Sequence, residues 1–103
     1  MNTYQRTIKK SIDFSGVGLH TGKFTKLKLI PAKVDTGIIF IRINKNDRVE
    51  IKAYIDNVID TNRGTTLAVN GNKIHTVEHL LAAIYALGID NLYIEIDNIE
   101  PPI

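Results

Sequence analysis

The stretch HTVEHLLAAIYALGIDNLYIEI, residues 75–96, contains both kinds of secondary structure on which the predicted fold depends. Its first part carries apolar side chains three or four residues apart, which is the spacing of one helical face; this stripe consists of Val77, Leu80, Leu81, Ile84 and Leu87. Thr76 or His75 stands at the expected N-cap, and Gly88 stands where a glycine commonly ends a helix. Residues 91–96 alternate apolar and polar side chains and therefore predict a strand.

The remainder of the chain predicts further short strands. Alternating and β-branched segments favour strands at residues 8–14, 24–30, 38–43, 49–55, 65–69 and 73–75. The last two flank the hairpin dipeptide Asn70-Gly71, and Asn57 to Gly64 is predicted to be a loop. The sum is an α+β fold, in which a mixed or antiparallel sheet packs in two layers against one long helix. One helix covers little of such a sheet. Either the other face is solvated or the covering layer continues beyond Ile103, and we expect the second.

The composition is that of one small globular domain and restricts the possible functions. The chain has 103 residues, of which 44% are hydrophobic and 23% charged, and a formal net charge of +2. This charge is too small to predict a nucleic-acid partner. There is no cysteine, so any metal ion must be bound by His, Asp or Glu. No apolar run approaches the roughly 18 residues of a membrane span, and the N-terminus lacks the apolar core of a signal peptide. We therefore expect a cytoplasmic protein that is not transmembrane.

The segment His75-Thr76-Val77-Glu78-His79 concentrates titratable groups at the start of the predicted helix. The positive end of the helix macrodipole favours the neutral imidazole that binds metal ions, and it stabilises a carboxylate. Glu78 is therefore placed to act as general base on a metal-bound water, with His79 as a metal ligand. The same two residue types also occur at helix starts without any catalytic role, the glutamate complementing the dipole and the histidine lying on the surface.

Two other interpretations concern the histidines. Residues 75–79 match H-x-x-E-H, the zinc-protease pattern in inverted order, which needs both histidines on one helical face and a distant acidic ligand. The preceding Asn70-Gly71 hairpin puts His75 at a strand end or at the cap, so the two imidazoles are not expected to face one metal ion. His20 lies in the glycine-dense stretch 16–22, where backbone can approach a ligand closely; a plain hairpin bend explains the same residues.

Several stretches resemble the family of UDP-3-O-acyl-N-acetylglucosamine deacetylases, bacterial enzymes of lipid A synthesis. They follow the family's order over essentially the whole chain and comprise Gln5-Arg6-Thr7, Gly16 to Gly22, Pro31-Ala32, Asp35-Thr36-Gly37-Ile38, Thr76-Val77-Glu78-His79-Leu80, Leu87-Gly88-Ile89-Asp90-Asn91 and Glu100-Pro101-Pro102-Ile103. The resemblance implies a two-domain, zinc-dependent amide hydrolase, with residues 1–103 as its incomplete N-terminal domain. Each domain of that family packs a sheet against two helices, and the first contains a small inserted sheet, which here includes part of residues 49–69.

The resemblance also implies roles for individual residues. His79 matches a zinc ligand, and Glu78 matches the general base that activates the zinc-bound water. His20 matches a residue near the active site. A loop that borders the substrate cleft matches Asn62, Arg63 and Gly64. The implied substrate is a UDP-linked, 3-O-acylated N-acetylglucosamine, from which acetate is released.

In the family the second domain supplies the remaining zinc ligands, a histidine and an aspartate. The resemblance therefore implies that the missing second domain of the same protein is a partner of this chain, and that residues 1–103 alone are inactive. An alternative is a truncated, non-catalytic module that binds a sugar nucleotide or a protein partner through the same surface.

Overall fold

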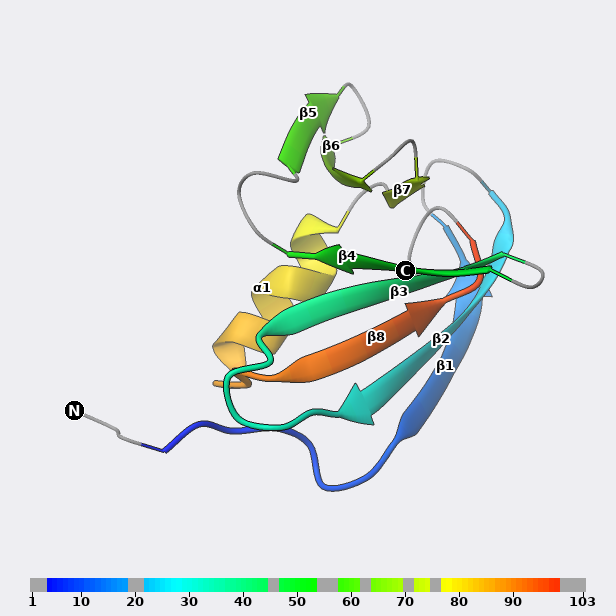
Figure 1. Ribbon diagram of the computed structural model, residues 1–103. Helices are drawn as coiled ribbons and strands as arrows, with labels where there is room; N and C mark the ends of the chain where they lie inside the picture. The colour runs from blue at the N-terminus through cyan, green and yellow to red at the C-terminus, as the bar shows by residue number, and fades with distance from the viewer. Residues whose placement is uncertain are drawn as a thin grey trace.

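The computed structural model describes residues 4–18, 22–44, 47–53, 58–61, 64–69, 72–74 and 77–98. Within these ranges, the larger of two sheets has the strand order β1-β2-β8-β3-β4, and the smaller has the order β5-β6-β7 (Figure 1). The larger sheet consists of β1 (Ile12–Val17), β2 (Phe24–Pro31), β3 (Ile38–Asn44), β4 (Asp47–Lys52) and β8 (Leu92–Ile96). The other elements are β5 (Val58–Thr61), β6 (Gly64–Val69), β7 (Asn72–Ile74) and the helix α1 (Glu78–Ala86).

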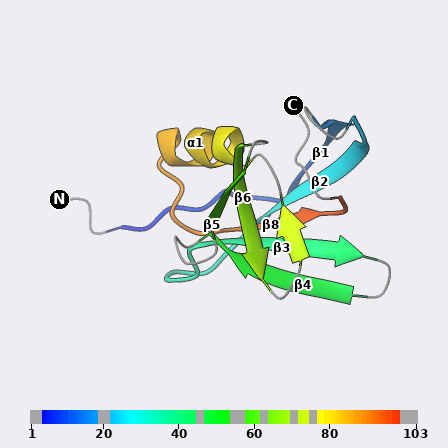
Figure 2. The same ribbon diagram turned by 90° about the horizontal axis from the view of Figure 1, so that it is seen from above.

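Helix α1 forms a second layer on one face of the larger sheet, as the view in Figure 2 shows. The predicted α+β class, with a sheet-on-helix arrangement and a small additional sheet, is thus confirmed. Strands β3 and β8 are parallel neighbours, and the other pairs of the larger sheet are antiparallel. Parallel neighbours need a long crossover connection, and the chain from β4 through the smaller sheet and α1 provides it.

The register of the strands decides which side chains face α1. Phe40 of β3 lies opposite Ile94 of β8, and Ile94 lies opposite Leu29 of β2. Because side chains alternate between the two faces of a strand, these three share the face that α1 covers. The alternation of buried and half-buried residues along β8 agrees with this assignment.

One apolar core joins the two sheets and the helix. Its fully or nearly buried members come from all three, and they are Leu27, Phe40, Ile51, Leu67, Ile74, Val77, Ile84, Leu92, Ile94 and Ile96. Burial of one large apolar side chain contributes roughly 1.5–3 kcal/mol. Because Leu67 of β6 and Ile74 of β7 belong to this core, the smaller sheet is held against the start of α1 by packing.

The start of α1 differs from the prediction. The N-cap residue is Val77, and its side chain makes no capping hydrogen bond, so the prediction of Thr76 or His75 at the cap is wrong. The N–H of Val77 instead donates to the carbonyl oxygen of Thr65 in β6, at 3.1 Å. A strand thus satisfies a backbone group that a polar side chain commonly satisfies.

The end of α1 confirms the predicted glycine stop. Gly88 has a φ of 71°, a conformation that glycine adopts without steric cost. Its N–H donates to the Tyr85 carbonyl, and the N–H of Ile89 donates to the Ile84 carbonyl, which together form a Schellman motif. Leu87, which was assigned to the buried stripe, is 69% exposed, because the helix has already ended and the chain turns there.

A hydrogen-bond network lies at this C-terminal end of α1. The buried side chain of Asn91 accepts from the N–H of Gly37 and donates to Gln5 Oε1, each at 2.8 Å. Gln5 Oε1 also accepts from the N–H of Asp35 at 2.8 Å, and Gln5 Nε2 donates to Asp35 Oδ1 at 2.7 Å. The backbone of Arg6 adds bonds to residues 90 and 91. Segments far apart in sequence are therefore joined at one place.

Three strand predictions also need correction. Strand β4 spans Asp47–Lys52, where residues 49–55 were predicted. Residues 58–61 form the strand β5, where a loop over Asn57 to Gly64 was predicted; the β-branched Val58 and Ile59 pair with β6. Strand β1 begins at Ile12 and runs through Gly16 to Val17, rather than spanning residues 8–14. Gly16 remains in the strand because it pairs opposite Thr25 of β2.

The core is open between α1 and the strands β1 and β2. A hollow of about 380 Å³ lies there, with apolar lining residues that include Phe14, Leu29 and Leu80. Phe14 is 50% exposed, so α1 alone covers only part of the sheet, as predicted. Within the described ranges, no helix has the length and apolar composition of a membrane span.

Candidate active site

Glu78 occupies the first position of α1 and is held by the smaller sheet. Its half-buried carboxylate accepts a hydrogen bond through Oε2 from the N–H of Thr65, at 3.1 Å. The position also faces the positive end of the helix dipole, which stabilises a carboxylate. The backbone of β6 thus holds Oε2 of this side chain.

His79 is the second residue of α1, directly after Glu78, and its side chain is exposed. The imidazole of His79 is therefore accessible in the first turn of α1, next in sequence to Glu78. The roles of His79 as metal ligand and Glu78 as general base stay predictions. Of the two histidines in the H-x-x-E-H pattern, α1 itself contains His79 alone. The requirement of that pattern for two histidines on one helical face is not met by this helix.

The donor set for a metal ion is incomplete in the part of the chain that the structure describes. A catalytic zinc site takes three protein ligands and keeps one position open, whereas no group of three or more His, Cys, Asp or Glu side chains in these ranges is arranged to hold a metal ion. The exposed His79 imidazole has the right chemistry for one zinc ligand. The described residues thus fit zinc as a contributor of one ligand, and they do not by themselves form a complete site.

Among the remaining predicted site residues, the structure describes Gly64 alone. His20, His75, Asn62 and Arg63 lie outside the described residues. Gly64 begins β6 and pairs with Thr61 of β5. Strand β6, which Gly64 begins, reaches Glu78 through the N–H of Thr65.

Thr65 is the site residue that sequence reasoning missed. It contributes its backbone N–H and carbonyl, which every residue but proline possesses, so no residue type marks it in the sequence. Only the position of β6 against the start of α1 reveals it, and that position depends on the burial of Leu67 and Ile74.

Arg42 is a charged residue of β3 on the face of the sheet that α1 covers, since it lies opposite Ile96 in the register. Partial burial lowers the pKa of Arg42 from its ordinary value, and the charge of Asp97 opposes that shift. Its Nη1 donates to the Ile43 carbonyl at 2.6 Å. An arginine remains a cation at neutral pH, so this residue contributes a fixed positive charge at the end of β3.

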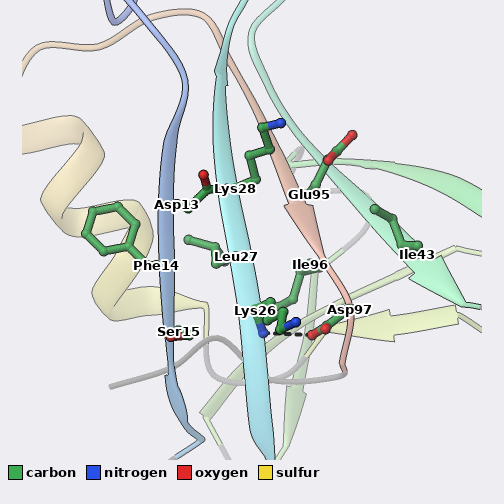
Figure 3. Close-up of a pocket in the computed structure, with 10 residues that line it drawn as sticks. All are labelled: Asp13, Phe14, Ser15, Lys26, Leu27, Lys28, Ile43, Glu95, Ile96 and Asp97. Atoms are coloured by element: carbon green, nitrogen blue, oxygen red, sulfur yellow. Dashed lines mark hydrogen bonds between the residues drawn. The ribbon is translucent and has the colours of Figure 1, made fainter.

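A second hollow lies on the outer face of the sheet and has mixed charge. Figure 3 shows its lining from β1, β2 and β8, where lysines and carboxylates alternate: Asp13, Lys26, Lys28, Glu95 and Asp97. The N–H of Lys26 donates to Asp97 Oδ1 at 2.8 Å, and Glu95 pairs with Arg48 of β4. Opposite charges that neutralise one another across neighbouring strands are typical of a solvated sheet surface, so we place the candidate site at α1 instead.

A carboxylate held by the backbone and an accessible imidazole are residue types that can together activate water, as hydrolytic enzymes do. The family model of UDP-3-O-acyl N-acetylglycosamine deacetylases matches residues 5–103. The chain is 52% identical to the UDP-3-O-acyl-N-acetylglucosamine deacetylase of Thermodesulfovibrio yellowstonii, over 97% of this chain and 34% of that protein. It is 56% identical to the enzyme of the same name in Thioalkalivibrio sulfidiphilus, over 96% of this chain and 33% of that protein.

A further relative is the bifunctional enzyme LpxC/FabZ of Chlorobaculum tepidum, which is 48% identical over 100% of this chain and 22% of that protein. The chain belongs to the UDP-3-O-acyl-N-acetylglucosamine deacetylase family. It spans between 22% and 34% of the length of these three relatives.

Proposed function

We propose that the full-length protein is a zinc-dependent hydrolase that removes the N-acetyl group from a UDP-linked, 3-O-acylated glucosamine, in the cytoplasm and in the course of lipid A synthesis. Family membership supports the substrate class. The observation that carries the chemistry is the adjacency of a fixed Glu78 and an exposed His79 at the start of α1.

In this proposal His79 contributes one zinc ligand, and the other ligands come from outside the described residues. Bound zinc would supply a polarised water and a Lewis acid for the amide carbonyl. Glu78 then acts as general base: it takes the water proton on Oε1, while Oε2 stays bonded to the N–H of Thr65. A carboxylate held at one oxygen keeps its other oxygen in a defined direction, as proton transfer requires.

The substitution Glu78→Gln in the full-length protein tests the role of the base. The amide keeps the size of the side chain and an oxygen for the Thr65 N–H, but it cannot accept the water proton. We expect kcat for acetate release to fall by about 10²- to 10⁴-fold, the usual contribution of general acid–base catalysis.

The matched control is Glu95→Gln on the outer face of the sheet, where the carboxylate pairs with Arg48. This variant is expected to keep the kcat of the unchanged protein. Turnover of Glu78→Gln at the level of the control would remove Glu78 from the mechanism.

A further inference from the structure

The backbone of Thr65 links the smaller sheet to the first turn of α1 at two points. Its carbonyl oxygen accepts from the N–H of Val77, and its own N–H donates to Glu78 Oε2, both at 3.1 Å. One strand residue thus satisfies a backbone donor at the helix start and also binds the side chain of the following residue. The two bonds hold the proposed base from a second element of the fold.

A strand N–H is a more rigid partner for a carboxylate than another side chain would be. The N–H of Thr65 is set by the pairing of β6, in which Thr65 lies opposite Asp60 of β5. Strand β6 is set in turn by the fully buried Leu67. A glutamate side chain has three rotatable torsions, so an anchor of this kind restricts the positions that its carboxylate can reach.

We propose that Thr65 is a positioning residue for the reaction: its N–H holds Glu78 Oε2 so that Oε1 points toward the reacting water. This inference rests on the proposed role of Glu78 as general base. It assigns to the smaller sheet a part in orienting the base, in addition to its packing on the core.

The N–H can be removed without changing the side chain. Replacing Thr65 by its α-hydroxy analogue in the full-length protein converts the amide at that position into an ester. The ester lacks the donor to Glu78 but keeps the Thr65 carbonyl that accepts from Val77. We expect kcat to fall by about 10- to 100-fold with KM unchanged, because small displacements of a catalytic group have effects of this order.

A control variant separates positioning from a general weakening of the sheet. The same ester at Thr66, which pairs with Ile59 in the hairpin, perturbs the backbone of β6 next to the site and is expected to leave kcat within twofold. A loss of kcat in the Thr66 ester equal to that in the Thr65 ester would overturn the proposal.

A double-variant cycle in kcat distinguishes positioning of Glu78 from a purely structural role of the Thr65 N–H. With Gln at position 78 there is no base to orient, so the Thr65 ester should lower the remaining kcat no further. A further tenfold loss in that background would show that the N–H acts on something other than Glu78, and would contradict the inference.

The two proposals fail in different ways. If Glu78→Gln keeps normal turnover, the proposed function of Glu78 is wrong whatever the ester does. If Glu78→Gln loses turnover while the Thr65 ester keeps kcat within twofold, the base stands and the positioning role of Thr65 is wrong.

Discussion

The two ends of α1 use hydrogen bonds differently. At its C-terminal end, Asn91, Gln5 and Asp35 satisfy one another and the backbone of Gly37 in a network around a side chain that is only 3% exposed. At its N-terminal end, Glu78 Oε2 accepts a hydrogen bond from the N–H of Thr65, and the side chain of His79 is exposed. A site that acts on another molecule needs polar groups that this molecule can reach, whereas polar groups with a structural role bond to one another within the protein.

The stretches that resemble the family can be divided between the two ends of α1. Gln5-Arg6-Thr7, Asp35-Thr36-Gly37 and Asp90-Asn91 are far apart in sequence, but the structure joins them in the network at one end of α1. We infer that their role is to hold the fold, and that the chemistry belongs to Glu78 and His79 at the other end. Similarity of a motif therefore does not by itself indicate a catalytic residue.

The largest expected effect comes from His79→Ala in the full-length protein. If His79 is a zinc ligand, the purified variant should contain much less zinc by elemental analysis. Its kcat should fall by at least about 10³-fold, because Lewis-acid stabilisation worth several kcal/mol is lost. His75→Ala is the matched control and should keep both zinc and turnover. Zinc that depends equally on both histidines would instead support the H-x-x-E-H interpretation.

At the opposite end, Asn91→Ala should lower stability and not catalysis. It removes the acceptor of the part-buried Gly37 N–H and one of two donors to Gln5 Oε1, and the donor left unpaired at Gly37 costs about 1–3 kcal/mol. Native-state hydrogen exchange of the β3 and β8 amides would measure this loss within the domain.

Gly88→Ala tests whether the backbone conformation at the end of α1 requires glycine. A Cβ at position 88 would meet nothing within 4 Å, but the φ of 71° is unfavourable for alanine. We expect a loss of about 1–2 kcal/mol from backbone strain alone. Gly88→Asn should lose less, since asparagine tolerates this conformation better. Equal losses in the two variants, measured by the same hydrogen exchange, would show that strain is not the cause.

The smallest expected effect is that of Arg48→Ala on the outer face. The Arg48 side chain is 55% exposed and that of its partner Glu95 is 18% exposed. Surface ion pairs of this kind contribute below about 1 kcal/mol, and salt weakens them further. Unchanged kcat and a slightly lower stability are expected at low ionic strength. A large loss of turnover would indicate that the active site lies on this outer face of the sheet and not at the start of α1.

The sequence was informative where local patterns decide the structure. The apolar stripe predicts α1, Gly88 predicts its end, and alternation predicts β2, β3 and β8 within one or two residues. The N-cap and β5 were missed because distant partners determine them: the Thr65 carbonyl satisfies the helix start, and pairing with β6 makes residues 58–61 a strand. The network around Asn91 was likewise hidden, since its members lie up to 86 residues apart.

For the site, residue types pointed to Glu78 and His79, because carboxylate and imidazole side chains carry chemistry that can be recognised in a sequence. Thr65 could not be found in this way, as its contribution is a backbone N–H whose direction depends on the tertiary position of β6. The predicted roles of His20, Asn62 and Arg63 remain predictions.

The most direct test of the contrast between the two ends is to measure kcat and local unfolding free energy together for Glu78→Gln and Asn91→Ala in the full-length protein. The account predicts that Glu78→Gln loses kcat by at least about 100-fold with stability nearly unchanged, and that Asn91→Ala loses stability while each folded molecule keeps its kcat. If Glu78→Gln kept its kcat, or if Asn91→Ala lost kcat to the same degree in its folded form, the assignment of chemistry to one end and structure to the other would be wrong.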